Sequence, residues 1–519
     1  MKARRSTARW PAAAVPVIAL VGLNLLAHFL PFERVSLTGD DLENMIVRLR
    51  PGWSYAESIR SWLAQPGPRP FVFSAMLLDW LVGDAPALWI TVLFLSSTLL
   101  AVSVYYLTVE IVGNRALGLI CSGAFVLLPN KVQLYHHLLY SNMNAAYAVT
   151  AAGAALFLLY LRKPHRATLW VSLVCYTLSI FWYETGFFLP LILMAAAWRY
   201  GRTRLRDSLL FLLPAGLCLL WRWYLFGQGY PVMGFTGPLQ HFKQQLFVTV
   251  PNLYFGRRMA KWIVYGLARF PAIESPWIFI LLAMNGLALW GFSRWFRRQP
   301  LPPIPLRAIS LSIALWIFFL APFVFLPYME SRHTALASIG FSILIVAAIR
   351  FFIGWRPLCW VFLFGMGLII SQGIAWNQVV SCRMNNAVAR TIEEKRESIA
   401  RSDRVIVDQY SFAERIPYTW VHDPLNLLDQ YWGVDGLHGR GFETLLSWER
   451  ERLPPEQRGR RRHFYLARGP VQKEGKALIF NVYDFTQYQC VPERVPQDGT
   501  VVIDYAAVYP NGFHHGKRE

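Results

Sequence analysis

The sequence lacks the motifs with which many soluble enzymes bind nucleotides. It has no Walker phosphate loop, no glycine-rich dinucleotide fingerprint with a strand before it, and no prominent Gly-x-Ser-x-Gly elbow. Nothing in the chain therefore indicates ATP or redox chemistry. It also lacks internal repeats and helices broken at mid-membrane in two paired halves, which are typical of transporters.

Charged residues are scarce, at 16% of 519 residues, whereas hydrophobic residues make up 55%. Several apolar runs reach the roughly 20 residues that a helix needs to cross ~30 Å of hydrocarbon, which predicts a polytopic membrane protein. Acidic residues are scarcer than basic ones, 31 against 51, which gives a net charge of +20. Much of this excess lies in short loops, where it sets membrane topology, so we expect no nucleic-acid partner.

Cysteine is also rare, with six residues. Cys382 and Cys490 fall in the polar C-terminal region and could form one disulfide if that region lies outside the cytoplasm. Their spacing does not show whether they are close together, so the pairing stays open. The other four lie in apolar runs, where we expect packing roles: Cys121, Cys175, Cys218 and Cys359.

The N-terminus carries Lys and Arg residues ahead of an apolar run over 11–30. This run is long for the core of a signal peptide, and Phe-Leu-Pro-Phe at 29–32 offers no small-residue cleavage site. We therefore expect an uncleaved first helix with a cytoplasmic N-terminus, in a multi-pass protein of the inner (plasma) membrane.

Hydropathy and the positions of basic residues predict 11 spans within a membrane domain over 1–378. An outer loop, 32–85, contains two pieces, 53–65 and 69–82, that we expect to be helices lying in the outer interface. With this assignment every strongly basic short loop falls inside, whereas counting 69–82 as a span would reverse all later loops. The predicted spans are 12–31, 86–109, 115–129, 143–161, 167–183, 187–199, 208–226, 276–293, 307–327, 334–350 and 357–376.

From about residue 379 to 519 the chain becomes polar and rich in proline. We interpret this region as a small extracytoplasmic α/β domain of typical size. The pattern predicts a charged helix over 383–400. Short alternating or apolar runs predict strands at 404–408, 463–467, 477–484 and 500–504.

Candidate functional residues lie at the predicted outer ends of the spans. Asp40 and Asp41 follow the first span, where one carboxylate could act as a general base and the other as its helper. Capping of a helix N-terminus is the alternative interpretation of this pair. Glu184 ends the fifth span, and a carboxylate at that depth either lines a cavity or reaches out to the interface.

A second group is suited to an anion. Glu330, Arg332 and His333 lie together at another outer end, and an arginine can hold a phosphate with two donors, although a surface ion pair is the alternative. The other cations that could join this field are Arg69, Lys131, Arg257 and Arg258. His136 and His137 have no acidic partners at metal-ligand spacing, so we predict no metal site and expect His137 only to line the site.

Four elements in chain order resemble the GT-C superfamily of integral membrane glycosyltransferases over about residues 10–376. This group includes protein O-mannosyltransferases, lipid A aminoarabinose transferases and related bacterial enzymes. The elements are Gly39-Asp40-Asp41, Arg69-Pro70-Phe71, Tyr183-Glu184-Thr185-Gly186 and the stretch from Glu330 to Gly340. The chain departs from the family pattern in two of them. In the third, relatives carry Lys where this chain has Tyr183; in the fourth, this chain has His333 for Tyr and Ala337 for Pro, and its Glu lies one place earlier.

The resemblance implies a sugar donor carried on a polyprenyl phosphate and transfer at the outer face. Asp40 would deprotonate the acceptor hydroxyl, and one in-line displacement would invert the anomeric carbon. Arg332 and Arg69, with Arg257 or Lys131, would stabilise the charge of the departing lipid phosphate. No cofactor is implied, and the sequence does not indicate a divalent cation.

Two alternatives remain open from the sequence. A lipid or polysaccharide flippase or exporter would tolerate amide substitutions at Asp40 and Asp41. A transferase using a lipid-diphosphate oligosaccharide would usually need a divalent metal. The sequence leaves open the sugar and whether the acceptor is a glycan, a lipid or a protein.

Overall fold

The structure is a computed structural model of the chain, and it falls into two compact units. One unit comprises Met1–Phe32 and Tyr55–Trp376, and the other comprises Glu33–Ser54 and Asn377–Glu519. The described residues are 9–30, 54, 56–57, 59–60, 69–70, 78, 81–82, 86–136, 140–227, 239–299, 301–324, 329, 331–394, 404–408, 443–444, 464–467, 476–481, 488–492 and 500–504.

The first unit is helical and contains, among its described residues, seven helices long and apolar enough to cross a membrane. Each coincides with a predicted span, which confirms a polytopic helical membrane protein. Four shorter apolar helices coincide with the other four predicted spans, and their crossing stays a prediction. The seven are Ala87–Val112, Tyr140–Arg162, Arg202–Leu225, Trp277–Phe296, Leu306–Phe323, Arg332–Ile353 and Pro357–Trp376; the four are Ala14–Phe29, Arg115–Leu127, Arg166–Trp182 and Glu184–Ala197.

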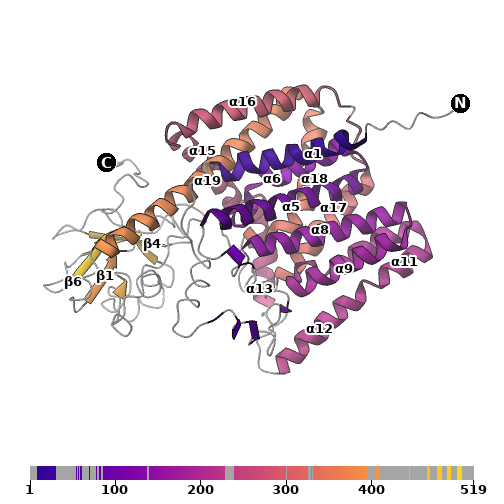
Figure 1. Cartoon of the computed structure of the whole chain (residues 1–519), viewed down its shortest axis with the longest axis horizontal. Helices are drawn as coiled ribbons and strands as arrows, with labels where there is room; N and C mark the ends of the chain where they lie inside the picture. Colours follow the sequence, from indigo (N-terminus) through magenta and orange to yellow (C-terminus); the bar gives the residue numbers. More distant parts are fainter. Residues whose placement is uncertain are drawn as a thin grey trace. The chain divides into compact units, whose positions relative to one another are not determined.

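The helices of this unit lie side by side in rows (Figure 1). Helix α5 (Pro86–Val112) packs against α8 (Tyr140–Arg162), and α8 packs against α9 (Arg166–Trp182). The remaining helices are α1 (Arg9–Asn24), η1 (Leu25–Phe29), α6 (Arg115–Leu127), η3 (Pro129–Lys131), α7 (Gln133–His136), η4 (Glu184–Gly186), α10 (Leu189–Ala197), η5 (Trp198–Tyr200), α11 (Arg202–Leu209), α12 (Leu212–Gly227), α13 (Leu239–Gln244), η6 (Gln245–Thr249), α14 (Val250–Tyr254), α15 (Arg257–Arg269), η7 (Phe270–Ala272), α16 (Trp277–Phe296), α17 (Leu306–Leu320), η8 (Ala321–Phe323), η9 (Ser331–Thr334), α18 (Ala335–Ile353) and α19 (Pro357–Glu394).

Glycine lets two of these helices approach closely. A Cβ atom on Gly340 of α18 would lie 2.2 Å from the backbone oxygen of Ser312 in α17. The two helix backbones are therefore in contact at this point, as is common in membranes, where small residues replace the hydrophobic driving force with close van der Waals packing.

A two-residue turn reverses the chain between α5 and α6. Gly113 has φ 74°, in the left-handed region that glycine tolerates, and its N–H donates to the Val109 oxygen at 2.8 Å. Asn114 follows as the N-cap, and its side chain accepts from the Leu117 N–H at 3.0 Å. The Gly-Asn pair thus ends one helix and starts the next.

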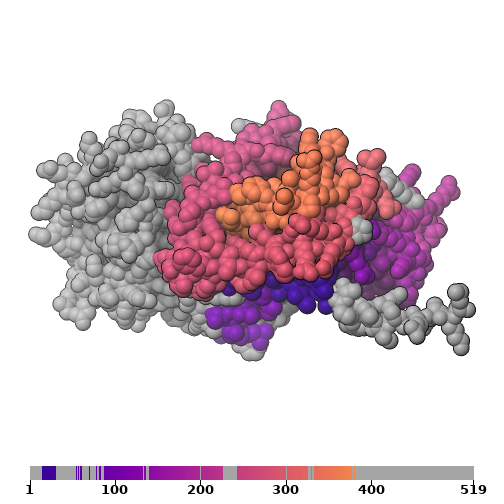
Figure 2. Space-filling model, turned by 90° about the horizontal axis from the view of Figure 1, so that it is seen from above, coloured from indigo at the N-terminus to yellow at the C-terminus, as the bar shows by residue number. Residues whose placement is uncertain are grey.

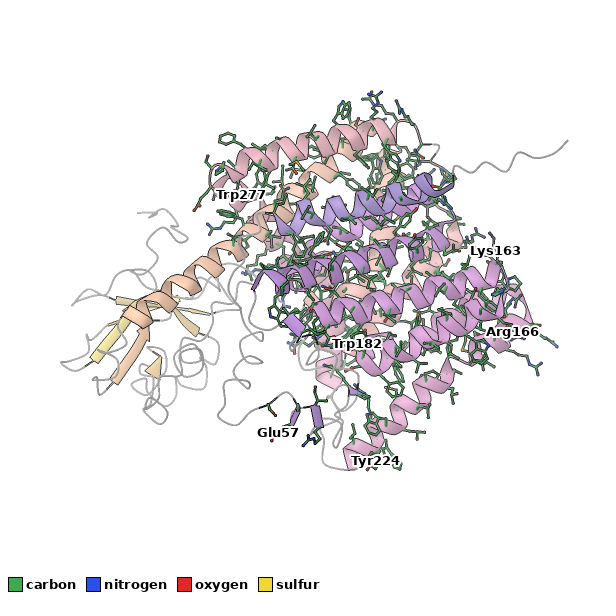
Figure 3. All side chains as sticks on the ribbon, viewed as in Figure 1. Glu57, Lys163, Arg166, Trp182, Tyr224 and Trp277 are labelled. Atoms are coloured by element: carbon green, nitrogen blue, oxygen red, sulfur yellow. The ribbon has the colours of Figure 1, made fainter. Side chains whose placement is uncertain are left out.

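One end of the helical unit is basic. Figure 3 shows Lys163 and Arg166 at the same end of α8 and α9, with Trp182 at the opposite end of α9. Arg162 and Glu110 form an ion pair at 3.1 Å at the Lys163 end. We call this the basic end and the other the opposite end; the positive-inside rule predicts that the basic end is cytoplasmic.

Helix α19 is longer than the sequence analysis predicts. It runs without a break from Pro357 to Glu394, whereas the hydropathy pattern predicts one helix over 357–376 and a separate one over 383–400. Residues 374–394 contain no proline or glycine, so nothing in the backbone ends the helix where the apolar run ends. Within the first unit, α19 is seen in orange beside the red α15–α16 region (Figure 2).

The second unit contains two small three-stranded sheets among its described residues. In one, β2, β1 and β6 are parallel, with Arg404 to Asp408 paired in register with Thr500 to Asp504. In the other, β3, β4 and β5 are antiparallel. Four strands occupy predicted segments, whereas β2 and β5 were not predicted. The strands are β1 (Arg404–Asp408), β2 (Glu443–Thr444), β3 (Phe464–Ala467), β4 (Lys476–Asn481), β5 (Tyr488–Pro492) and β6 (Thr500–Asp504).

Candidate functional site

The end of helix α9 and the turn after it position Glu184 at the opposite end of the helical unit. Helix α9 ends at Trp182, Tyr183 is extended at φ −144° and ψ 126°, and Glu184 begins the short 3₁₀ turn η4. A Cβ on Gly186 would lie 3.2 Å from the Thr150 Cγ2 atom, so this turn lies tightly against α8. The Glu-Thr-Gly turn therefore fixes the carboxylate at the end of the helical unit.

Arg69 holds this carboxylate with two donors. Its Nε donates to Glu184 Oε2 and its Nη2 donates to Glu184 Oε1, both at 2.9 Å. Its guanidinium also lies 4.7 Å from the centre of the Tyr183 ring. The Tyr183 ring thus contributes a cation–π contact. The bidentate geometry fixes both side chains.

Arg222 of α12 is a second cation on the same carboxylate. Its Nη2 lies 3.0 Å from Glu184 Oε1, and its side chain is only 12% exposed. One carboxylate thus lies between two guanidinium groups. Burial lowers the pKa of Arg69, but the Glu184 carboxylate outweighs this effect and raises that pKa above its usual value, so the pair is ionised.

Arg332 lies in η9, just before α18. Its Nη1 donates to the Tyr140 hydroxyl, and its guanidinium lies 5.0 Å from the Tyr140 ring centre. The Tyr147 hydroxyl donates to the Arg332 backbone oxygen at 3.2 Å. Thr334, two residues further on, donates through Oγ1 to the Asn130 backbone oxygen at 2.8 Å, which ties η9 to η3.

Tyr147 relates the two arginine sites to each other. It interacts electrostatically with Arg332, Arg69 and Glu184, so the three charges surround one buried side chain. We call Arg69, Tyr147, Glu184, Arg222 and Arg332 the arginine cluster. Three guanidinium groups and one carboxylate leave a net charge of +2. His333 interacts with the same charges, and its ring stacks on Phe323 at 4.7 Å.

Lys131 and Arg257 are placed differently from the arginine cluster. Lys131 is fully buried; its ammonium donates to the Leu128 oxygen at 3.0 Å and lies 4.4 Å from the Phe125 ring centre. Burial lowers the pKa of Lys131 well below its usual value. Arg257 is exposed at the first residue of α15. Neither residue belongs to the arginine cluster.

Helix α15 contributes positive charge beside the Arg332 segment. Arg258 Nη1 lies 3.4 Å from the Met329 backbone oxygen, directly before Glu330 in the chain. Burial, and then the charges of Arg257 and Arg258, lower the pKa of Lys261 to about 8. Burial is thus the main cause of this shift, and the two arginines at the start of α15 add to it.

Four predicted site residues lie outside the described residues: Asp40, Asp41, Glu330 and His137. The side chains of Cys382 and Cys490 also lie outside them. In the part of the chain that the structure describes, no three His, Cys, Asp or Glu side chains gather as metal ligands. The structure thus brings Arg69, Glu184, Arg332 and His333 together.

Three residues that contact Glu184 or Arg332 were not predicted from the sequence: Arg222, Tyr140 and Tyr147. For Arg222 a signal was available, because an arginine inside an apolar helix usually faces a partner or a cavity. Tyr140 and Tyr147 carry no comparable signal, since tyrosines are common in membrane helices and at their ends.

The comparisons with known proteins add little. No family model matches the chain, and no curated protein matches it. Among solved structures, the chain is similar to the apo form of the Archaeoglobus fulgidus oligosaccharyltransferase, with a TM-score of 0.40 and 14% identity. The match covers 82% of this chain and spans 64% of the length of that protein. A likeness this weak assigns neither fold nor function, so the proposals below rest on the chain's own geometry.

Proposed function

We propose that the chain is a membrane glycosyltransferase of the GT-C type. It moves a sugar from a polyprenyl-phosphate donor to an acceptor hydroxyl at the outer face of the membrane, with inversion. The observation that supports this proposal is the arginine cluster, because its five residues come from five separate segments of the chain and lie together at the end away from the basic loops.

The charge of the cluster suits a lipid monophosphate. In the donor, the phosphate is a diester with one negative charge, and as the sugar leaves it becomes a monoester with about −1.5 to −2. The cluster has a net charge of +2 and is held by ion pairs and ring contacts before substrate arrives. Fixed cations of this kind stabilise the additional negative charge that develops in the transition state.

The proposed reaction is one displacement. Asp40, helped by Asp41, takes the proton of the acceptor hydroxyl, and the acceptor oxygen attacks the anomeric carbon. The bond between that carbon and the phosphate oxygen breaks, and polyprenyl phosphate leaves beside Arg332. Glu184 and Arg222 act as positioning residues, because they fix the Arg69 guanidinium. We propose that residues 379–519 form an extracytoplasmic domain that helps select the acceptor.

The test of the lipid-phosphate site is direct binding. We expect a polyprenyl phosphate to raise the thermal stability of the purified protein, and the uncharged polyprenol to do so much less. Arg332→Gln should weaken binding of the phosphate about tenfold to a hundredfold, the usual contribution of a hydrogen bond between charged groups. Arg356→Gln, which removes an exposed charge between α18 and α19, should leave binding unchanged. Equal binding by the wild type and Arg332→Gln would overturn the proposed role of Arg332.

A further inference from the structure

A large apolar cavity lies between α1, α6, α16 and α19, and it shares no residue with the arginine cluster. Its volume is about 550 Å³. The wall follows the chain from Val15 in α1 through η1 to Leu30, and α16 from Met284 to Trp295. The lining residues are aliphatic or aromatic, apart from glycines and Met284, and Val15 and Leu287 are 53% and 65% exposed. The cavity is therefore dry and accessible from outside the helical unit.

A pair of amide side chains joins α16 to α19 next to this cavity, and the rings of Phe292 and Phe364 stack at 4.5 Å further along the two helices. The Asn285 and Gln372 amides exchange two hydrogen bonds of 2.8 Å, and Gln372 Nε2 also donates to the Leu26 oxygen at 3.1 Å. Glycine residues in the wall also leave space unfilled, because they have no side chain. A Cβ atom on Gly22 or Gly291 would meet no atom within 4 Å.

Three exposed arginines lie at or just after the basic end of α16: Arg294, Arg297 and Arg298. The Arg294 guanidinium lies 5.6 Å from the Trp290 ring centre. Within the described residues, none of the three has an ion pair. Arg298 continues the row of Gly291 and Trp295 at helical spacing, and its N–H still bonds to the Trp295 oxygen at 3.0 Å. The row of residues that lines the cavity, Gly291 and Trp295, is therefore followed by the positively charged side chain of Arg298.

We propose that this cavity binds one acyl chain of an anionic phospholipid whose phosphate lies against Arg294, Arg297 and Arg298. An empty void of this size would forfeit the contacts of every wall atom, and hydrocarbon chains are what surrounds a membrane helix. The wall from Val15 to Leu30, formed by α1 and η1, is about 22 Å long at 1.5 Å per residue, which suits one extended chain. Arginines at the cavity's end select a phosphate-bearing anionic headgroup.

This inference stands apart from the proposed function. The arginines belong to the basic end, whereas the arginine cluster lies at the opposite end. The lipid would be a resident of the leaflet at the basic end, predicted to be cytoplasmic, and would hold α16 in place without taking part in transfer. A polyprenyl phosphate would then compete poorly at this site.

The test uses the purified full chain in mixed micelles containing phosphatidylglycerol or phosphatidylcholine with identical acyl chains. We expect phosphatidylglycerol to raise the melting temperature more than phosphatidylcholine does. Gly291→Leu, which fills the cavity, should abolish most of this gain. Gly286→Leu is the matched control, because Gly286 lies on the same helix, has no atom within 4 Å of its Cβ position and does not line the cavity.

The headgroup is tested separately. The double substitution Arg297→Gln/Arg298→Gln should lower the apparent affinity for phosphatidylglycerol roughly tenfold, so that the two lipids act nearly alike. A full gain in Gly291→Leu would show that no chain enters the cavity, and an unchanged preference in the double variant would show that the headgroup lies elsewhere. Displacement of phosphatidylglycerol by an equal amount of polyprenyl phosphate would overturn the assignment to a phospholipid.

Discussion

Replacing Asp40 by Asn is expected to lower sugar transfer by about a hundredfold to ten-thousandfold, the usual contribution of a general base. The amide has nearly the same shape as the carboxylate but cannot accept the proton of the acceptor hydroxyl. Donor binding should be unchanged, because we propose that the arginine cluster, and not Asp40, holds the phosphate. Initial rates of transfer, compared at saturating donor, measure the effect.

Asp41→Asn provides the matched control for this experiment. The proposal gives Asp41 a helper's role, so its amide variant should retain more activity than Asp40→Asn. If both variants transfer sugar at the wild-type rate, the acidic pair only caps a helix, and a flippase or exporter becomes the better interpretation. If Asp40→Asn shows no thermal unfolding transition, Asp40→Glu is measured in its place. That variant keeps a carboxylate but shifts its position.

The second large effect is expected at Glu184. Glu184→Gln leaves the Arg69 and Arg222 guanidinium groups beside one neutral amide, where they repel each other. Removing one member of a buried ionic group commonly costs about 3–5 kcal/mol, and Glu184 is 20% exposed, so we expect about 3 kcal/mol of lost stability. Because Arg69 loses its fixed position, donor binding should also weaken by about tenfold.

A variant in an ion pair at the basic end serves as the control that separates the loss of stability from the loss of donor binding. Glu110 pairs with Arg162 at 3.1 Å and is 18% exposed, close to the exposure of Glu184. Glu110→Gln should therefore lower the melting temperature but leave donor binding unchanged. If Glu184→Gln binds donor as well as Glu110→Gln does, Glu184 is a structural residue only. A double-mutant cycle between Glu184→Gln and Arg69→Gln should show a coupling of about 1–3 kcal/mol.

The sequence predicts the helical part of the fold well because hydrophobic length and basic loops are local signals. The seven long apolar helices lie at predicted spans, and the basic loop at Lys163 lies at one end of α8 and α9. Helix α19 shows where this reasoning ends. Hydropathy marks the end of an apolar run, but only proline, glycine or a cap ends a helix, and residues 374–394 contain neither proline nor glycine.

Contacts between distant segments are less accessible to sequence reasoning. Arg69 and Glu184 were both candidates, but their pairing depends on where a break after α9 places the carboxylate. Arg222 had a signal, since it is an arginine in an apolar helix. Lys131 shows the reverse case: a lysine in a polar loop is expected at a surface, but the chain buries it against the Phe125 ring and the Leu128 backbone oxygen.

The measurement that tests the central claim most directly is photolabelling with a polyprenyl phosphate that carries a short photoreactive group next to the phosphate. The account predicts saturable labelling of the segments around Tyr140–Tyr147 and Arg332, lost in Arg332→Gln and blocked by unlabelled polyprenyl phosphate. Saturable labelling of the basic end around Arg162–Arg166 instead, or no saturable labelling at all, would contradict the assignment of the arginine cluster as the donor site.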